Sequence, residues 1–81
     1  MKRYFSRSKL RRAREARGLS QGDLGRLLGV RSSRPGVIVQ QYENGRRLPS
    51  VSRLWELAAK LDVTPDELMG SRPPKKIPRR A

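Results

Sequence analysis

The chain has 81 residues, enough for one small domain, and a domain of this size buries only about 60% of the surface that its unfolded chain exposes. It contains no cysteine and no histidine, so disulfides, thiolate metal sites, the usual zinc ligand sets and imidazole catalysis are excluded. We therefore expect no enzyme, no metal and no cofactor, and the lack of a long apolar run or signal peptide predicts a cytoplasmic protein without a membrane partner.

The charge is strongly positive and unevenly distributed. Twenty lysines and arginines against seven acidic residues give a net charge of +13. Residues 1–49 hold 13 basic and 3 acidic residues (+10), residues 50–70 hold 2 and 4 (−2), and residues 71–81 hold 5 and none (+5). Such a concentration of charge is typical of a protein that binds a polyanion. A ribosome-associated or merely solubilised basic protein is the alternative.

The first predicted helix spans residues 7–17 and follows a basic N-terminal arm, residues 1–6. Its sequence, RSKLRRAREAR, consists of good helix formers, with Leu10 and Ala13 at i, i+3 spacing. Gly18 follows where a helix would stop. This helix contains few apolar residues and many basic ones.

The second predicted helix spans residues 21–28. Ser20 is a candidate N-cap, and Asp23 three residues later approximates a capping box. The apolar residues Leu24, Leu27 and Leu28 follow at i, i+3, i+4 spacing. Gly25 inside the helix costs about 1 kcal/mol relative to alanine, so we expect it to serve the close approach of another helix.

The segment RSSRPGVIVQQYENG, residues 31–45, predicts a third helix at residues 35–43. Pro35 fits only in the first turn of that helix, Val39 and Tyr42 share an apolar face, and Asn44-Gly45 is a natural stop. The rival interpretation, a strand over residues 36–42, fails because no other segment has strand character to pair with it.

Two further helices and a tail complete the chain. Ser50 is the N-cap expected for the fourth helix, whose apolar stripe is Val51, Leu54, Leu57, Ala58 and Leu61. Trp55 lies beside this stripe, and we expect it to fill the core or a groove, the alternative being an interface residue. Thr64-Pro65 and the capping-box residue Glu67 predict a short fifth helix. Residues 71–81 have three prolines and five basic residues, which predicts a disordered basic tail.

Three fragments together resemble the helix-turn-helix domain of the phage-repressor and Cro class, called XRE-type. They are GLSQGDLGRLLGV (18–30), YENGRRLPS (42–50) and LWELAAKLDVTPDELM (54–69). With the first helix, the resemblance covers about residues 7–69 and implies a compact, all-α, five-helix lambda-repressor-like domain over residues 7–70. It also implies that Gly25 lets the third helix cross the second, and that Arg14 and Glu43 form a salt bridge.

The resemblance implies double-stranded DNA as partner, with helix 35–43 in the major groove of a pseudo-palindromic operator bound by a homodimer. Base contacts then fall to Gln41 first, then Gln40, with Val37 packing on a thymine methyl. The matching phosphate contacts are Gln21, Asn44, Arg46 and Arg47.

The segment between GV and ENG departs from the family pattern, because it holds twelve residues where the common motif has eight. Either the turn before the third helix is longer, or that helix gains about one turn. Pro35-Gly36 disfavours further helix, so we favour the longer turn. Arg34 is then a candidate base contact and Arg31 a candidate phosphate contact, the alternative being a solvated loop that carries two charges.

Three functions are compatible with these features. The leading hypothesis is a sequence-specific transcriptional regulator, a dimeric repressor that works at the nucleoid. The second is an antitoxin or protein-bridging module with an unknown partner protein, and the third is non-specific nucleic-acid binding through the net charge of +13.

Overall fold

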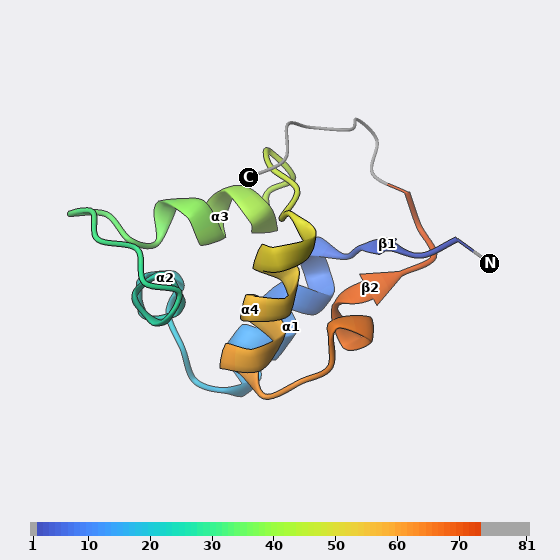
Figure 1. Ribbon diagram of the computed structural model, residues 1–81, viewed down its shortest axis with the longest axis horizontal. Coiled ribbons are helices and arrows are strands. Elements are labelled where there is room, and N and C mark those ends of the chain that lie inside the picture. The colour runs from blue at the N-terminus through green and yellow to red at the C-terminus, as the bar shows by residue number, and fades with distance from the viewer. Residues whose placement is uncertain (1, 74–81) are drawn as a thin grey trace.

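In this computed structural model, residues 2–73 are described, and they form four α-helices, one 3₁₀-helix and a two-stranded ribbon (Figure 1). The elements in chain order are β1 (Tyr4–Phe5), α1 (Arg7–Ala16), α2 (Gln21–Leu27), α3 (Val37–Glu43), α4 (Val51–Leu61), η1 (Pro65–Leu68) and β2 (Met69–Gly70). The predicted tail, residues 71–81, lies outside the described residues except for its first three positions.

The helices begin where capping residues satisfy the first free N–H groups. The Ser20 hydroxyl accepts from the Asp23 N–H and the Asp23 carboxylate accepts from the Ser20 N–H, both at 3.0 Å, which confirms the predicted capping box of α2. The Ser50 hydroxyl caps α4 by accepting from the Arg53 N–H at 3.2 Å. The backbone hydrogen bond from Ser20 lowers the pKa of Asp23, because it stabilises the carboxylate form.

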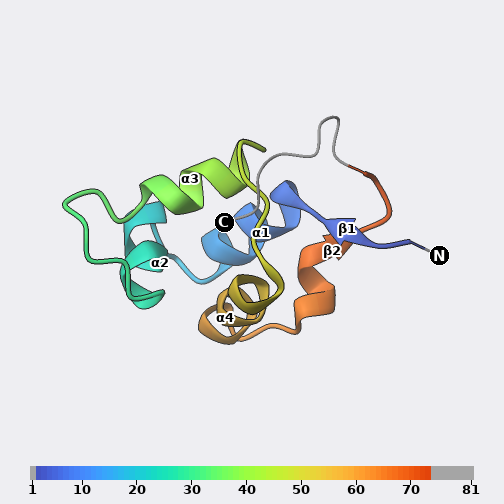
Figure 2. The same cartoon turned by 45° about the horizontal axis from the view of Figure 1, so that its top comes forward.

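A single core joins the helices, and Figure 2 shows α3 and α4 on different sides of α1. Its buried residues are Leu10, Leu24, Leu28, Val39, Tyr42, Leu57, Ala58, Leu61 and Leu68. The rings of Phe5 and Tyr42 meet edge to face with centroids 6.4 Å apart. Burial raises the pKa of Tyr42. These contacts fix α3 against the rest of the domain through one face only.

The four extra residues before α3 lengthen the turn, as we favoured. The segment between α2 and α3 runs from residue 28 to residue 36, and α3 begins at Val37, two residues later than predicted. The N–H of Val37 donates to the Arg34 carbonyl at 3.2 Å, which closes a turn around Pro35 and Gly36. Pro35 therefore precedes the helix instead of beginning it.

Two glycines allow this turn to lie directly on α2. A Cβ atom added to Gly25 would lie 1.9 Å from the Pro35 carbonyl oxygen, and one added to Gly36 would lie 2.8 Å from the Gly22 nitrogen. Both distances are too short for a side chain, so the backbones touch at both places. Gly25 serves a close approach, as predicted, but its neighbour is the turn that leads into α3 and not a residue within that helix.

The prediction of a fifth α-helix was wrong. The capping box at Thr64 and Glu67 is present, but it begins the 3₁₀-helix η1, which ends at Leu68. Met69 is extended because β2 pairs antiparallel with β1, with Phe5 opposite Met69 and Tyr4 opposite Gly70. The Ser6 N–H also donates to the Leu68 carbonyl at 2.9 Å. Pairing with residues assigned to the N-terminal arm thus replaces a further helical turn.

The expectation that Trp55 fills the core or a groove was also wrong. Trp55 is 62% exposed, and Val51, one turn earlier, is 64% exposed. The buried part of the predicted stripe is Leu57, Ala58 and Leu61. Val51 lies in the first turn of α4, at the edge of that stripe, and Trp55 lies beyond it, so both face away from the core.

Candidate nucleic-acid interface

The outward face of α3 carries the side chains predicted to read bases from this helix. Val39 and Tyr42 point into the core, and at 3.6 residues per turn the opposite side carries Val37, Gln40, Gln41 and the C-cap residue Asn44. Gln40 and Asn44 are exposed, whereas Gln41 and Val37 are half-buried. Of the two glutamines, Gln40 is the more open to solvent.

A buried ion pair anchors the C-terminal end of α3 to α1. Arg14 Nε donates to Glu43 Oε2 at 2.7 Å and Arg14 Nη2 donates to Glu43 Oε1 at 3.1 Å. The side chains are only 11% and 6% exposed, and Arg14 Nη1 also donates to the Leu19 carbonyl at 2.8 Å. The hydrogen bond to Glu43 raises the pKa of Arg14. The structure thus contains the salt bridge that the family resemblance implies.

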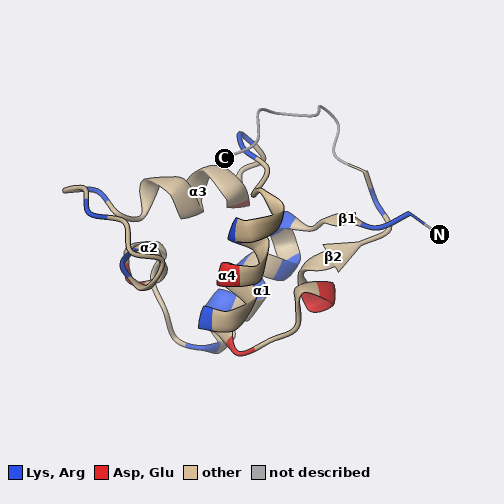
Figure 3. Cartoon of the chain, in the orientation of Figure 1, with Lys and Arg blue, Asp and Glu red and all other residues tan. Residues whose placement is uncertain are grey.

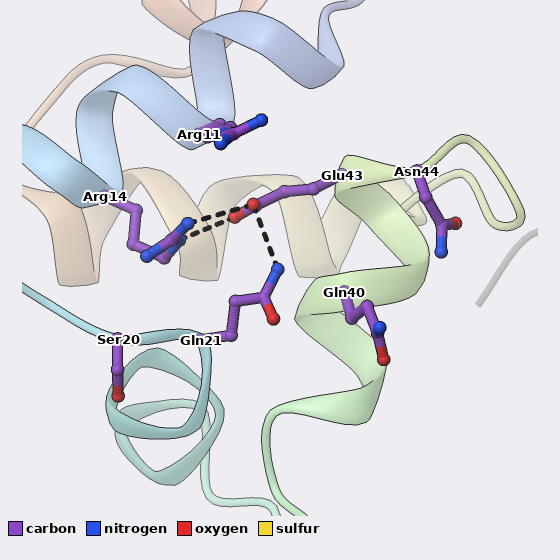
Figure 4. A pocket seen from close by; sticks show the side chains of 7 residues that line it. All are labelled: Arg11, Arg14, Ser20, Gln21, Gln40, Glu43 and Asn44. Atoms are coloured by element: carbon purple, nitrogen blue, oxygen red, sulfur yellow. Dashed lines mark hydrogen bonds and ion pairs between the residues drawn. The ribbon is translucent and has the colours of Figure 1, made fainter.

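An open cavity of about 510 Å³ lies over this ion pair, between α1, the start of α2 and α3 (Figure 4). Its lining residues are Arg11, Arg14, Ser20, Gln21, Gln40, Glu43 and Asn44. Every one of these side chains is polar or charged, so the cavity suits a hydrated or anionic group better than an apolar one.

Gln21, a predicted phosphate contact, lines this cavity, and a hydrogen bond to Glu43 fixes its side chain. Its Nε2 donates to Glu43 Oε1 at 3.2 Å, which adds a third hydrogen bond to the carboxylate already bound by Arg14. One of the two amide hydrogens of Gln21 is therefore committed to the protein itself, and the ion pair sets the orientation of the side chain.

The other predicted cationic contacts flank α3 on both sides. Arg31 and Arg34 are exposed on the long turn that precedes α3, whereas Arg46 is exposed and Arg47 half-buried in the loop that follows it. This second loop is a tight one, because Gly45 has a φ of +81° and the Asn44 side-chain oxygen accepts from the Arg46 N–H at 3.1 Å.

Two arginines that the sequence analysis missed lie beside the same end of α3. Arg7 Nη1 donates to the Asn44 carbonyl at 3.1 Å, and Arg11, which is 65% exposed, lines the cavity and approaches Glu15 at 3.5 Å. The signal was available, since Arg7, Arg11 and Arg14 follow one another at i, i+4, i+7 on a single helix face. Once Arg14 is paired with Glu43, the other two must lie near α3.

Basic and acidic residues are unevenly distributed over the domain (Figure 3). Basic residues predominate on α1 and also lie on the turn before α3 and in the loop after it, whereas acidic residues lie in the turn after α4 and in η1, and α4 itself carries both signs. The basic part surrounds the outward face of α3. Such a surface attracts a polyanion to that face and not to η1, whose charged residues are acidic.

Comparison with known families agrees with this geometry. A family model described as helix-turn-helix matches residues 10–68, which is most of the chain. The chain belongs to the XRE-type helix-turn-helix family. Neither a curated protein nor a solved structure matches it.

The helix-turn-helix unit of this XRE-type DNA-binding domain is α2, the long turn and α3. The matched range contains the whole unit, whereas Arg7 and the β1–β2 ribbon lie just outside it. Within residues 2–73, no helix is long and apolar enough to cross a membrane, and no group of acidic side chains is arranged to hold a metal ion.

Proposed function

We propose that this chain is a sequence-specific transcriptional regulator that binds double-stranded DNA as a dimer and represses transcription by occupying its operator. The observation that supports the proposal is the outward face of α3, where two glutamines lie between arginines of the preceding turn and of the following loop. A major groove admits one α-helix, and cations on either side of that helix meet the phosphates that border the groove.

Base recognition divides between α3 and the long turn. The amides of Gln40 and Gln41 suit adenine, because a glutamine pairs with N6 and N7 together, and Val37 suits a thymine methyl group. Arg34, on the exposed turn, suits guanine, whose O6 and N7 accept from a guanidinium. The turn thus adds a hydrogen-bonding side chain at the end of α3 where Gly36 and Val37 have none.

Phosphate contacts fix the position of the domain on the duplex. Gln21, Arg31, Asn44, Arg46 and Arg47 are the side chains that we assign to this role, and they lie around α3 without reading sequence. The buried pair of Arg14 and Glu43 takes no part in binding; it holds α3 and the amide of Gln21 in their positions.

Non-specific nucleic-acid binding is the second candidate, favoured by the net charge of +13. The two functions differ in their response to sequence. Charge alone produces binding that weakens steeply with salt and equally for all duplexes, whereas base reading by α3 adds discrimination that survives at physiological salt.

The test is selection of binding sites from a random duplex library, followed by affinity measurements at physiological salt. We expect the selected duplex to bind at least ~10³-fold more tightly than random duplex. Gln40→Ala and Gln41→Ala should each cost about 1–3 kcal/mol, confined to one base-pair position. Ser52→Ala, an exposed change on α4, serves as the control. Equal binding of selected and random duplexes would leave only the non-specific function.

A further inference from the structure

The loop after α3 carries the proposed phosphate contacts Asn44, Arg46 and Arg47, and backbone hydrogen bonds close it onto the helix. The N–H groups of Arg46 and Arg47 both donate to the Gln41 carbonyl, at 2.9 and 3.2 Å. Gly45 has a φ of +81°, a conformation that glycine adopts more readily than other residues. These bonds set the shape of the loop, but they join it to α3 alone.

Arg7, the first residue of α1, joins this loop to a second element. Its Nη1 donates to the Asn44 carbonyl at 3.1 Å. Its side chain also lies over Gly45, because a Cβ added to that glycine would lie 2.7 Å from Arg7 Nη1 and 3.2 Å from Arg7 Cδ. A cation at this place is favourable, since the last carbonyls of a helix carry partial negative charge. Arg7 therefore holds the loop by a hydrogen bond, by charge and by packing.

The β1–β2 ribbon fixes the start of α1, and the backbone of Arg7 with it. The Ser6 hydroxyl caps α1 by accepting from the Lys9 N–H at 3.3 Å, and the Ser6 N–H donates to the Leu68 carbonyl at 2.9 Å. The Lys9 ammonium donates to the carbonyl of Met69, in β2, at 2.7 Å. The place from which Arg7 reaches the loop is thus set by η1 and β2 and not by α3.

We propose that Arg7 is a positioning residue for DNA binding, which holds the loop after α3 so that Arg46 and Arg47 meet the phosphate backbone in place. The proposal rests on the DNA-binding function proposed above, through its phosphate contacts and not its base contacts. A loop that is ordered before binding loses less conformational freedom on binding, so affinity rises without a further contact to DNA. The family model matches residues 10–68, which leaves out Arg7, β1 and β2, so this support lies beyond the matched pattern.

The first measurement is amide hydrogen exchange of the free protein. Arg7→Met removes the donor and the charge but keeps an unbranched side chain over Gly45. The amides of Arg46 and Arg47 should then exchange at least ~5-fold faster, because the loop opens more often. Arg7→Lys keeps a donor and the charge and should restore most of the wild-type rate. Arg12→Met is the matched control, since Arg12 is exposed on the same helix about 140° round from Arg7, and it should leave both rates unchanged.

The second measurement is the affinity for a duplex of random sequence, which depends on phosphate contacts. Arg7→Met should weaken this binding at least ~5-fold, and Arg7→Lys should recover most of the loss. Arg12→Met removes the same charge and should have a smaller effect. In a variant with alanine at both Arg46 and Arg47, Arg7→Met should cost no more than the control does, because the contacts that Arg7 positions are gone.

Three results would overturn the positioning role. Unchanged exchange rates in Arg7→Met would show that Arg7 does not hold the loop. A full loss of affinity from Arg7→Met without Arg46 and Arg47 would show that Arg7 contacts phosphate itself. Equal losses from Arg7→Met and Arg12→Met would leave charge alone as the explanation. Failure of the proposed function is a separate result, equal binding of selected and random duplexes by wild type, and the exchange rates and the random-duplex affinities still decide the role of Arg7.

Discussion

The two ends of α3 are held to the domain by different physical means. At the C-terminal end, Glu43 accepts hydrogen bonds from Arg14 and Gln21, and Arg7 bonds the Asn44 carbonyl. At the N-terminal end, no side chain caps the helix, and the chain is positioned by backbone contact between Gly25 and Pro35. The C-terminal end is fixed by an ion pair and hydrogen bonds, and the N-terminal end by close packing of backbone against backbone.

This difference explains where the domain tolerates additional residues. A charge network requires particular side chains at particular positions, so the segment from Val39 to Gly45 keeps the pattern of the family. The backbone contact requires only that Gly25 has no side chain facing the Pro35 carbonyl, so residues added between α2 and Pro35 cause no conflict. Because loop closure costs only about 0.6 kcal/mol for each doubling of length, four extra residues in the turn cost little.

The largest expected loss of stability comes from removing one partner of the ion pair at the C-terminal end of α3. Glu43→Gln leaves the Arg14 guanidinium buried without a counter-charge, and we expect a loss of about 3–5 kcal/mol in the free energy of unfolding, measured by urea denaturation. Glu56→Gln is the matched control, because its pair with Arg53 is 3.8 Å long and half of the Glu56 side chain is exposed. Such a pair contributes at most about 1 kcal/mol.

A double variant sharpens the same comparison. Arg14→Met combined with Glu43→Leu removes both buried charges, and we expect it to be more stable than either single variant, since no unpaired charge remains. A double variant that lost the sum of the single effects would show that the two side chains do not act as a pair, and the C-terminal anchor would then need another explanation.

A smaller loss of stability is expected at the N-terminal end of α3, where backbone packs against backbone. Gly25→Ala places a Cβ 1.9 Å from the Pro35 carbonyl oxygen, so the turn must move, at a cost of about 1–3 kcal/mol in the free energy of unfolding. Gly22→Ala, on the same helix, is the control, since the nearest neighbour of its Cβ would be the flexible Arg26 side chain at 3.6 Å, an ordinary van der Waals distance. It should be neutral or stabilising by up to about 1 kcal/mol. Equal effects at Gly22 and Gly25 would contradict the close contact.

Much of this arrangement could be predicted from the sequence, because it depends on local chemistry. The capping residues Ser20, Ser50 and Thr64 act within one helical turn, so sequence spacing alone identifies them. Gly25 was recognisable because a glycine inside a helix needs a reason. The pairing of Arg14 with Glu43 came from the family resemblance, not from spacing.

Other features depend on contacts between distant residues and carried little local signal. Strands of two residues are too short to show alternation, so the pairing of Phe5 with Met69, and with it the end of η1, was not predicted. Gly36 looked like a turn residue, although its role is to touch Gly22. The exposure of Trp55 depends on where the core ends along α4, which periodicity does not specify.

The smallest expected effect on stability is in the long turn before α3. A change there should instead be visible in DNA binding. Arg31 and Arg34 are exposed, so replacing both with alanine should change the free energy of unfolding by no more than about 0.5 kcal/mol. If both cations neutralise phosphates, the log–log salt dependence of DNA binding should become shallower by about 0.9 for each. If Arg34 reads guanine, replacing Arg34 should instead relax the preference at one base-pair position, and only the loss of Arg31 should make the salt dependence shallower.

Ser33→Ala, between the two arginines, is the control and should change neither the salt dependence nor the base preference. An unchanged slope and an unchanged preference would make the turn a solvated loop, and recognition would then rest on α3 alone.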